Sequence, residues 1–368
     1  MLTSWIDEEL ALLDTQALRR ALRLQDPALV NFASNNYLGL THHPLVLAGA
    51  EAALHQYGSG SASARLLSGH TPLHAELEQS LAAWVNQEAA LIFPAGYMAN
   101  LGVITSLAGP SDAVILDRLC HASLVDAARL SGARLLVYHH ADADDAERVL
   151  KRAQSYRRRL LVTESLFSMD GDIPPLKELL ALARRYQATA LVDEAHALGV
   201  YGDQGHGLSQ GWDVVLGTLS KALASQGGFA AGSRVCIDYL TNKARSFIFT
   251  TGLSPVSVGA ALAALQVIQK NPEVLKKVQA RALALREGLR SQGWTTHPSE
   301  SQIIPILVGE ATTALELTEC LRHKGFFAPA IRPPAVHAHE CRLRLSVTAE
   351  HTQEQINHFL EVLGHGHE

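Results

Sequence analysis

The chain has 368 residues, of which 47% are hydrophobic and 18% are charged, so it can bury a large core and is not disordered throughout. Its 31 basic and 36 acidic side chains give a net charge of −5, which argues against general electrostatic binding to nucleic acid or to an anionic membrane. The four cysteines are widely spaced and form no CxxC motif, which argues against a disulfide scaffold and a zinc ribbon.

The N-terminal segment, residues 3–23, is predicted to be an amphipathic helix, because Ile6, Leu10 and Leu13 recur near helical spacing. It is acidic and has no basic region before an apolar run, so it is unlike a signal peptide. The most apolar later stretch, residues 256–268, is too short to cross a bilayer. We therefore expect a cytoplasmic protein without a membrane segment.

From residue 89 to about residue 250, short apolar runs alternate with longer helical patterns. The expected strands are 89–93, 113–117, 134–138, 160–164, 189–193, 214–218, 228–231 and 247–250. The clearest helical patterns between them are 74–85, 122–130 and 176–186. Continuous apolar strands that alternate with helices predict an α/β fold with a mostly parallel sheet, flanked by helices on both faces.

Beyond residue 255 the pattern changes. One long helical pattern runs to about residue 291, and short strands are expected at 303–308, 325–330 and 342–346. This order predicts a smaller C-terminal α+β domain. We therefore expect an N-terminal helix and arm (1–35), a large domain (36–255) and a small domain (256–368).

Two strand ends carry charged residues that suit one cofactor. Asp193 ends an apolar strand, and Lys221 follows the strand that ends at Thr218. Read alone, the acid could cap a helix or turn, and the lysine could lie at the surface. Delivered to one edge of a parallel sheet, they suit pyridoxal 5'-phosphate (PLP), because the lysine can form a Schiff base and the acid can keep the pyridine nitrogen protonated.

A phosphate site is also expected. The sequence Phe93-Pro-Ala-Gly96-Tyr97 is a strand end, a glycine turn and a helix start, which would present free N–H groups to an anion. Thr218 could add a hydroxyl, as could Thr251 after the last expected strand of this region. As an isolated motif the glycine turn is a weak signal, since many such turns contain glycine.

Eight short motifs follow one another along the chain in an order that points to one family. They are the segments 31–39, 65–69, 96–100, 117–123, 164–172, 192–196, 218–221 and 331–334. Together they resemble the motifs of the α-oxoamine synthases, PLP-dependent enzymes of fold type I. The resemblance extends from about Arg19 to His351, and it implies that the large domain binds PLP.

The resemblance implies roles around the cofactor ring. Lys221 would hold PLP and later move protons at the Cα atom of the substrate. Asp193 would pair with the pyridine nitrogen, and His121 would stack on the ring face. His196 would hydrogen-bond near the phenolic oxygen, and Ser168 would also lie beside the ring.

The resemblance also implies where the phosphate binds. The N–H groups of Gly96 and Tyr97, with Thr218, would hold the phosphate of the same subunit. Thr251 would reach the phosphate of the neighbouring subunit, which implies a homodimer with a shared active site.

Three further residues would bind substrates by the same resemblance. Arg332 would bind the amino-acid carboxylate, for which a planar guanidinium is suited. Asn35 would face the site, and Arg19 would lie on the side of the acyl donor.

The implied reaction condenses L-alanine with a pimeloyl thioester, carried by CoA or by an acyl carrier protein, and releases CO2. The product would be 8-amino-7-oxononanoate, a precursor in biotin biosynthesis. Two alternatives stay open: another α-oxoamine synthase that joins glycine to acetyl-CoA and forms 2-amino-3-oxobutyrate, and a noncatalytic PLP-binding protein.

The sequence departs from the usual family pattern at three places. Asn36 replaces an acid, Ala224 replaces a glycine, and the segment 335–337 replaces Thr-Val-Pro. We expect these changes to affect amino-acid and acyl specificity rather than cofactor binding.

The chain contains 18 histidines, of which we expect only His121 and His196 to do chemistry. His337, His339 and Cys341 alternate like metal ligands on a strand, but they lack a convincing fourth ligand. We expect no metal site.

Overall fold

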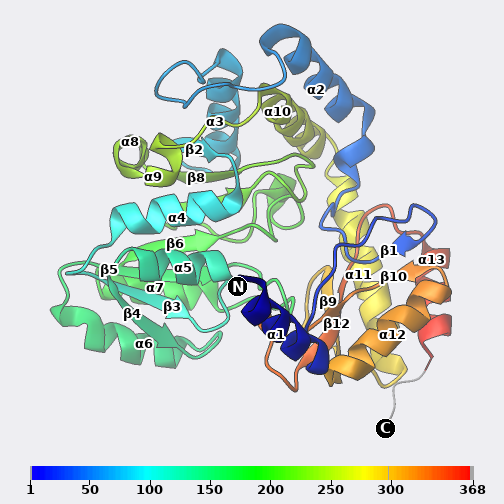
Figure 1. Ribbon diagram of the computed structural model, residues 1–368. Helices are drawn as coiled ribbons and strands as arrows, with labels where there is room; N and C mark the ends of the chain where they lie inside the picture. Colours follow the sequence, from blue (N-terminus) through cyan, green and yellow to red (C-terminus); the bar gives the residue numbers. More distant parts are fainter. Residues whose placement is uncertain (1, 297, 365–368) are drawn as a thin grey trace. The chain divides into compact units, whose positions relative to one another are not determined.

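The computed structural model describes residues 2–296 and 298–364, and its helices and strands are labelled in Figure 1. These residues form two compact units. The large unit comprises residues 35–168 and 172–277, and the small unit comprises the remaining described residues. The domain limits expected from the sequence stay a prediction, because compactness alone does not show that a segment folds by itself.

The large unit contains a seven-stranded sheet with the order β2-β8-β7-β6-β5-β3-β4. The strands are β2 (Ala89–Phe93), β3 (Ala113–Asp117), β4 (Arg134–Tyr138), β5 (Arg159–Glu164), β6 (Thr189–Asp193), β7 (Val214–Thr218) and β8 (Gly228–Gly232). Neighbours from β7 to β4 pair in parallel, whereas β8 is antiparallel to both β2 and β7. The predicted α/β fold with a mostly parallel sheet is confirmed.

Both faces of this sheet are covered, as its continuous apolar strands require, since every residue of β3 and β7 is buried. One face packs against α4 (Gly96–Leu107), α5 (Ala122–Leu130), α8 (Arg234–Lys243) and α9 (Arg245–Ile248). Figure 1 shows α4 and α5 lying along the sheet. Helices α6 (Ala143–Arg152) and α7 (Leu176–Arg185) pack against each other and against β4 and β6 respectively.

The other α-helices of this unit pack against one another, and one of them also packs against β2. Helix α10 (Pro255–Lys270) packs along α2 (Pro44–Tyr57) and also contacts α3 (Pro72–Trp84). Gly49 and Gly259 lie at the crossing of α2 and α10, where a Cβ atom on Gly259 would lie 2.4 Å from the carbonyl oxygen of Gly49. Short 3₁₀ helices occur at η1 (Leu40–His42), η2 (Ala153–Ser155) and η3 (Asp203–Gly205).

The small unit has its own sheet and core. Its antiparallel sheet has the order β11-β12-β9, and β1 pairs in parallel with β10. The strands are β1 (Val30–Asn31), β9 (Ile303–Gly309), β10 (Phe326–Phe327), β11 (Ala330–Ile331) and β12 (Cys341–Ser346). The helices are α1 (Leu2–Thr15), α11 (Glu273–Ser291, which starts in the large unit), α12 (Ala311–His323) and α13 (Gln353–Leu363). Side chains from β9, β12, α11, α12 and α13 meet in one apolar core.

Two predicted helices were too long. The N-terminal helix ends at Thr15, and Ala17 follows with a φ of 54°, a left-handed conformation that does not continue a helix. The pattern from residue 255 to residue 291 is two helices, because Pro272 has no N–H to donate and the residue before a proline avoids the helical region.

Two predicted strands were also wrong. The segment 247–250 begins in helix α9, where Phe247 packs edge-on against Phe93 of β2 with ring centroids 5.8 Å apart. Its apolar residues therefore fill the core from a helix. The segment 325–330 forms two short strands, β10 and β11, which pair with β1 and β12 respectively.

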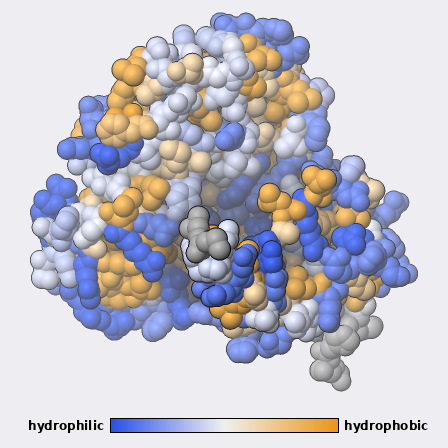
Figure 2. Space-filling view, viewed as in Figure 1, coloured by the Kyte–Doolittle hydropathy of each residue, from blue (hydrophilic) through white to orange (hydrophobic). Residues whose placement is uncertain are grey.

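On the face seen in Figure 2, hydrophobic residues form separate patches among more widespread hydrophilic ones. None of the helices in the described part of the chain combines the length and the apolar character that crossing a membrane would need.

Candidate active site

A cavity of about 300 Å³ lies in the large unit at the carboxyl ends of its central strands. Glu164, Asp193 and Thr218 are the last residues of β5, β6 and β7, so parallel pairing brings them to one edge of the sheet. The cavity is lined by Ala95, Gly96, Tyr97, Asn100, His121, Ser123, Glu164, Asp193, Ala195, His196, Gly217, Thr218, Ser220 and Lys221.

Lys221 lies at one side of this cavity and contacts a histidine. Its Nζ atom is 2.9 Å from Nε2 of His196, and Nδ1 of His196 is 2.6 Å from the hydroxyl of Tyr37. The Tyr37 hydroxyl donates a hydrogen bond of 3.0 Å to Oδ1 of Asn35. Because Tyr37 is completely buried, these contacts are shielded from water. The predicted residues Lys221, His196 and Asn35 are therefore linked through a tyrosine.

Asp193 is held by donors from two elements. Its Oδ2 atom accepts a hydrogen bond of 2.9 Å from the Asn100 amide on α4, and Oδ1 accepts one of 2.9 Å from the backbone N–H of Ala195. The Asn100 amide also donates to the hydroxyl of Ser123. These bonds fix the carboxylate of a buried residue, which would otherwise be costly to keep inside the protein.

Glu164 is a second buried carboxyl group in the cavity. It is the register partner of Asp193 on the neighbouring strand and accepts a hydrogen bond from the backbone N–H of His121. Burial, and then the negative charge of Asp193, raise the pKa of Glu164 to about 8. A carboxyl group with that pKa is mostly protonated at neutral pH.

His121 caps the N-terminus of α5 and faces the cavity. Its Nδ1 atom lies 2.7 Å from the hydroxyl of Ser123 and accepts from the N–H of that residue at 3.2 Å. Burial lowers the pKa of His121, the charge of Asp193 opposes this, and the charge of Lys221 adds to it. A neutral, flat imidazole at neutral pH can stack on a cationic ring without charge repulsion.

The start of α4, which also lines the cavity, is suited to an anion. Helix α4 begins at Gly96, and Ala95 before it provides no side-chain cap, so the first N–H groups of the helix are not bonded by a capping side chain. The Thr218 hydroxyl lies 2.7 Å from that of Ser220, at the same edge. Gly228 keeps this turn close to the sheet, because a Cβ atom there would lie 2.5 Å from Cα of Gly96.

Other predicted residues lie elsewhere. Among the described residues that line the cavity, neither Ser168 nor Thr251 occurs, and Thr251 instead forms a β-bridge with Ala64. Arg19 and Arg332 share a hollow of about 710 Å³ within the small unit. The roles given to these four residues stay predictions.

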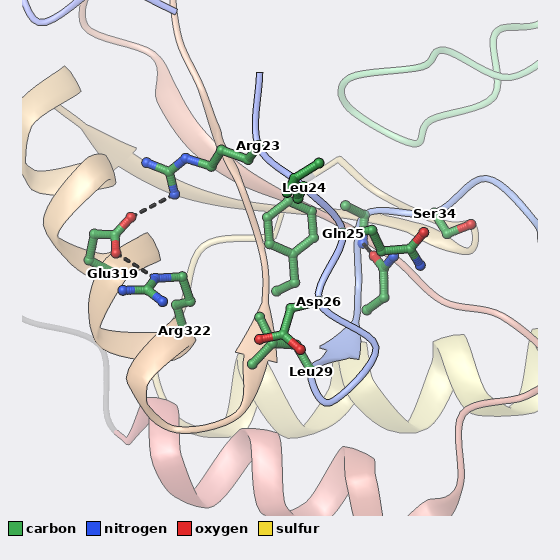
Figure 3. Close-up of a pocket in the computed structure, with 11 residues that line it drawn as sticks. Arg23, Leu24, Gln25, Asp26, Leu29, Ser34, Glu319 and Arg322 are labelled. Carbon is green, nitrogen blue, oxygen red and sulfur yellow. Dashed lines mark hydrogen bonds and ion pairs between the residues drawn. The ribbon is translucent and has the colours of Figure 1, made fainter. Parts of the chain in front are cut away.

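A further hollow, of about 660 Å³, lies in the small unit beside α12 (Figure 3). Glu319 accepts hydrogen bonds of 2.6 Å from Arg23 and 2.7 Å from Arg322, so its carboxylate is already bonded to two side chains of this hollow. The hollow contains none of the predicted site residues. Its size alone does not make it the reaction site.

Four cavity or near-cavity residues had no role in the sequence prediction: Tyr37, Asn100, Ser123 and Glu164. All four lie inside the eight family motifs, and this position in the sequence is the signal that could have identified them. Their roles depend on contacts between separate elements, such as the bond between Asn100 and Asp193.

Comparison with known proteins agrees with this geometry. The family model for aminotransferase class I and II matches residues 27–363. The chain belongs to that family. An 8-amino-7-oxononanoate synthase 2 from Bacillus subtilis (strain 168) is 41% identical and aligns over 97% of this chain and 96% of its own. A relative from Desulforudis audaxviator (strain MP104C), whose name gives the same activity provisionally, is 48% identical over 98% of each chain.

Solved structures point to the same group of enzymes. A serine palmitoyltransferase variant from S. paucimobilis with bound PLP–myriocin aldimine has a TM-score of 0.91 and 31% identity, over 98% of this chain and 96% of its own. The chain is therefore a PLP-dependent acyltransferase of the α-oxoamine synthase type, with fold type I. The predicted cofactor is confirmed, and the alternative of a noncatalytic protein is set aside.

The residues present fit PLP. Lys221 and Asp193 face one cavity, the uncapped start of α4 suits a phosphate, and His121 offers a flat ring. Within the described residues, no group of three or more His, Cys, Asp or Glu side chains is arranged as a metal site.

Proposed function

We propose that the enzyme condenses L-alanine with a pimeloyl thioester and forms 8-amino-7-oxononanoate, CO2 and the free thiol. The names of its relatives support the substrates and a place in biotin biosynthesis. The observation that carries the chemistry is the shared cavity of Lys221, Asp193 and His121. The homodimer with a shared site and the cytoplasmic location expected from the sequence remain part of this proposal.

When bound, PLP supplies an electron sink for the negative charge that develops at Cα of the amino acid. Lys221 would hold the cofactor and move the proton at Cα. Its Nζ atom lies 2.9 Å from Nε2 of His196, a group that can exchange a proton with it. Asp193, oriented by Asn100, would keep the pyridine nitrogen protonated. The N–H groups of Gly96 and Tyr97, with Thr218, would bind the phosphate, and Ser168 would lie beside the ring.

Arg332 keeps its predicted role as the site for the amino-acid carboxylate. Its Nε atom is buried and has no hydrogen-bond partner among the described residues. Burial lowers the pKa of Arg332, and the positive charges of Arg20 and Arg23 act in the same direction. An incoming carboxylate would supply both the missing acceptor and the missing negative charge. Arg19, which lines the same hollow, would serve the acyl donor. Asn35, which accepts a hydrogen bond from the Tyr37 hydroxyl beside His196, would face the substrates.

The cofactor assignment is tested by reduction with borohydride. The purified protein should be yellow, and peptide mapping after reduction should find the cofactor fixed to Lys221. A Lys221→Ala variant should keep its fold and lose turnover. Cofactor attached to a different lysine would contradict the assignment.

The substrate assignment is tested with a matrix of amino acids and thioesters. L-Alanine, glycine and L-serine are each combined with pimeloyl-CoA, a pimeloyl acyl carrier protein, acetyl-CoA and palmitoyl-CoA, and release of thiol and CO2 is followed. We expect kcat/KM for L-alanine with at least one of the pimeloyl donors to exceed that of every pair without L-alanine or without a pimeloyl group by more than about 10-fold, roughly 1.4 kcal/mol. If glycine with acetyl-CoA turns over best, the alternative reaction replaces the proposal.

The predicted role of Thr251 at the phosphate of the neighbouring subunit is tested by substitution. Thr251→Ala should weaken PLP binding in a dimer, and sedimentation should show a particle of two chains. A fully active monomer would contradict the shared site.

A further inference from the structure

A buried ionic cluster lies beside the cavity but does not line it. In the large unit, His140 stands between two carboxylates: Nδ1 is 3.0 Å from Oδ1 of Asp117, and Nε2 is 2.8 Å from Oδ2 of Asp172. The edge of the Phe167 ring packs against the imidazole, with centroids 4.4 Å apart and an angle of 86°. The Asp117 side chain is fully buried, and those of Asp172 and His140 are 10% and 19% exposed.

Asp117 connects this cluster to the loop that carries His121. Its Oδ1 atom accepts a hydrogen bond of 2.9 Å from the N–H of Leu119, and Oδ2 accepts one of 2.8 Å from the N–H of Ala141. The backbone oxygen of Asp117 accepts from the N–H of Cys120. The turn that delivers His121 to the cavity is therefore built on Asp117, and His140 holds that carboxylate from the other side.

Asp172 connects the cluster to a second loop. Its backbone oxygen accepts a hydrogen bond of 3.0 Å from the N–H of Phe167, which closes the loop that contains Ser168. Its second carboxylate oxygen, Oδ1, is buried and has no partner among the described residues. Among these residues, His140 is thus the only side chain shown bonding to the Asp172 carboxylate. Removal of His140 would leave a buried, uncompensated charge.

His140 keeps its charge in this position. Burial by itself would lower its pKa, but the hydrogen bonds and charges of Asp117 and Asp172 raise it to about 10. A protonated imidazole donates from both ring nitrogens, so it can serve both carboxylates at once, whereas a neutral imidazole can donate to only one. The cluster is therefore a two-sided ionic clamp rather than a single hydrogen bond.

We propose that His140 is a positioning residue of the active site, which acts through Asp117 and Asp172 to fix the loops that carry His121 and Ser168. His140 does not touch the cavity, so it takes no direct part in the reaction. The proposal rests on the role that the proposed function gives to His121 beside PLP, and not on the identity of the acyl donor.

The test compares His140→Gln with His139→Gln. Glutamine at position 140 retains one donor group but no charge. His139 is the adjacent histidine, its side chain is 67% exposed, and it pairs with Asp145 outside the cluster, so it is the matched control. Two measurements need no acyl substrate: the Kd of the apoenzyme for PLP, and hydrogen exchange of the backbone N–H groups of Leu119 and His121.

For His140→Gln we expect the Kd for PLP to rise at least about 10-fold and hydrogen exchange at both N–H groups to be faster. We also expect a lower kcat at saturating PLP. For the His139→Gln control, each of these quantities should stay within about 2-fold of the wild type. Asp172→Asn should have a similar effect, and the double variant should be no worse than the more affected single variant, because one clamp is broken in each.

A His140→Gln enzyme that melts at a lower temperature but binds PLP and exchanges at these sites like the wild type would show a purely structural role and overturn the proposal. If that variant does not fold, Asp172→Asn, which removes the carboxylate on the other side of His140, decides by the same two measurements. If the substrate assignment is wrong, the differences in PLP binding and hydrogen exchange between these variants and the wild type should still be found. Only the preferred pair of amino acid and thioester would then differ from the proposed one.

Discussion

Nε2 of His196 lies 2.9 Å from Nζ of Lys221, and the opposite nitrogen of the same ring lies 2.6 Å from the Tyr37 hydroxyl. One arrangement of protons satisfies the whole chain of contacts. Lys221 donates to Nε2, Nδ1 donates to the Tyr37 oxygen, and Tyr37 donates to Asn35. Tyr37 thereby selects the tautomer in which Nε2 of His196 accepts from the lysine. Without this contact, the His196 ring could take either tautomer.

Replacement of Tyr37 by phenylalanine should therefore lower kcat about 10-fold at saturating PLP. The change removes the acceptor for Nδ1–H and frees the ring to take the other tautomer, which would present an N–H to Lys221. Loss of the buried bond should also reduce the free energy of unfolding by about 1–3 kcal/mol. Steady-state kinetics and denaturant unfolding measure the two effects.

Tyr186→Phe is the control for this prediction. The Tyr186 hydroxyl donates to Glu147 at 2.7 Å, away from the cavity residues, so its removal should leave kcat unchanged. Equal kcat values for Tyr37→Phe and the wild type would show that His196 does not need the tyrosine.

Glu164→Gln should change how the stability of the apoenzyme depends on pH. The unfolded chain loses the Glu164 proton near pH 4.5, whereas the folded chain keeps it until about pH 8. Between these values the unfolded state binds fewer protons, so this group makes the wild type less stable as pH rises. Glutamine does not titrate and still accepts from the N–H of His121. Relative to the wild type, the free energy of unfolding of the variant should therefore rise across this window by on the order of a few kcal/mol. Above pH 8 the difference should be constant.

Denaturant unfolding of both apoenzymes from pH 5 to pH 9 checks this expectation. Glu178→Gln, at an exposed site on α7, should run parallel to the wild type. A constant difference between Glu164→Gln and the wild type over the whole range would mean that Glu164 is ionised in the folded protein at every pH tested.

Gly228→Ala should weaken cofactor binding. A Cβ atom at this position would lie 2.5 Å from Cα and 2.6 Å from N of Gly96, so the start of α4 would have to move. Because that helix start is the expected phosphate site, we expect the Kd for PLP to rise at least about 10-fold, roughly 1.4 kcal/mol. Titration of the apoenzyme with PLP, followed by absorbance, measures it.

Gly60→Ala serves as the comparison, because no atom lies within 4 Å of a Cβ placed there. Its Kd for PLP should match that of the wild type. Unchanged PLP binding in Gly228→Ala would place the phosphate away from Gly96.

Ala224→Gly should stabilise the protein by ~1 kcal/mol. Ala224 has a φ of 50°, a left-handed conformation that an alanine adopts at a cost and a glycine adopts freely. The usual family residue at this position is glycine, so the change restores the usual backbone freedom three residues after Lys221. Thermal unfolding of the apoenzyme measures the gain.

The opposite result is expected for Ala48→Gly, at an exposed position within helix α2, where glycine should cost up to about 1 kcal/mol. If both glycine variants are destabilised equally, the left-handed backbone at position 224 is not a source of strain.

The sequence by itself determined the central sheet and the two ends of the cofactor site. Continuous apolar runs such as 113–117 and 214–218 can be stable only when buried on both faces, so the parallel sheet follows from local pattern. Asp193 ends one such strand and Lys221 follows another, and parallel pairing must bring the ends of these strands to one edge. The eight family motifs added His121, His196 and the glycine turn at Gly96, all of which line the cavity.

Only the tertiary structure decided which partners these residues have. Tyr37 and His196 are 159 residues apart in the chain, and no local pattern records a contact that depends on packing between elements. The same is true of His140, which as one of two adjacent histidines in the sequence gives no sign of its two carboxylates. The raised pKa of Glu164 depends on burial and on the charge of Asp193. Desolvation and charge pairing arise from the assembled fold, whereas apolar period and strand ends are properties of the chain itself.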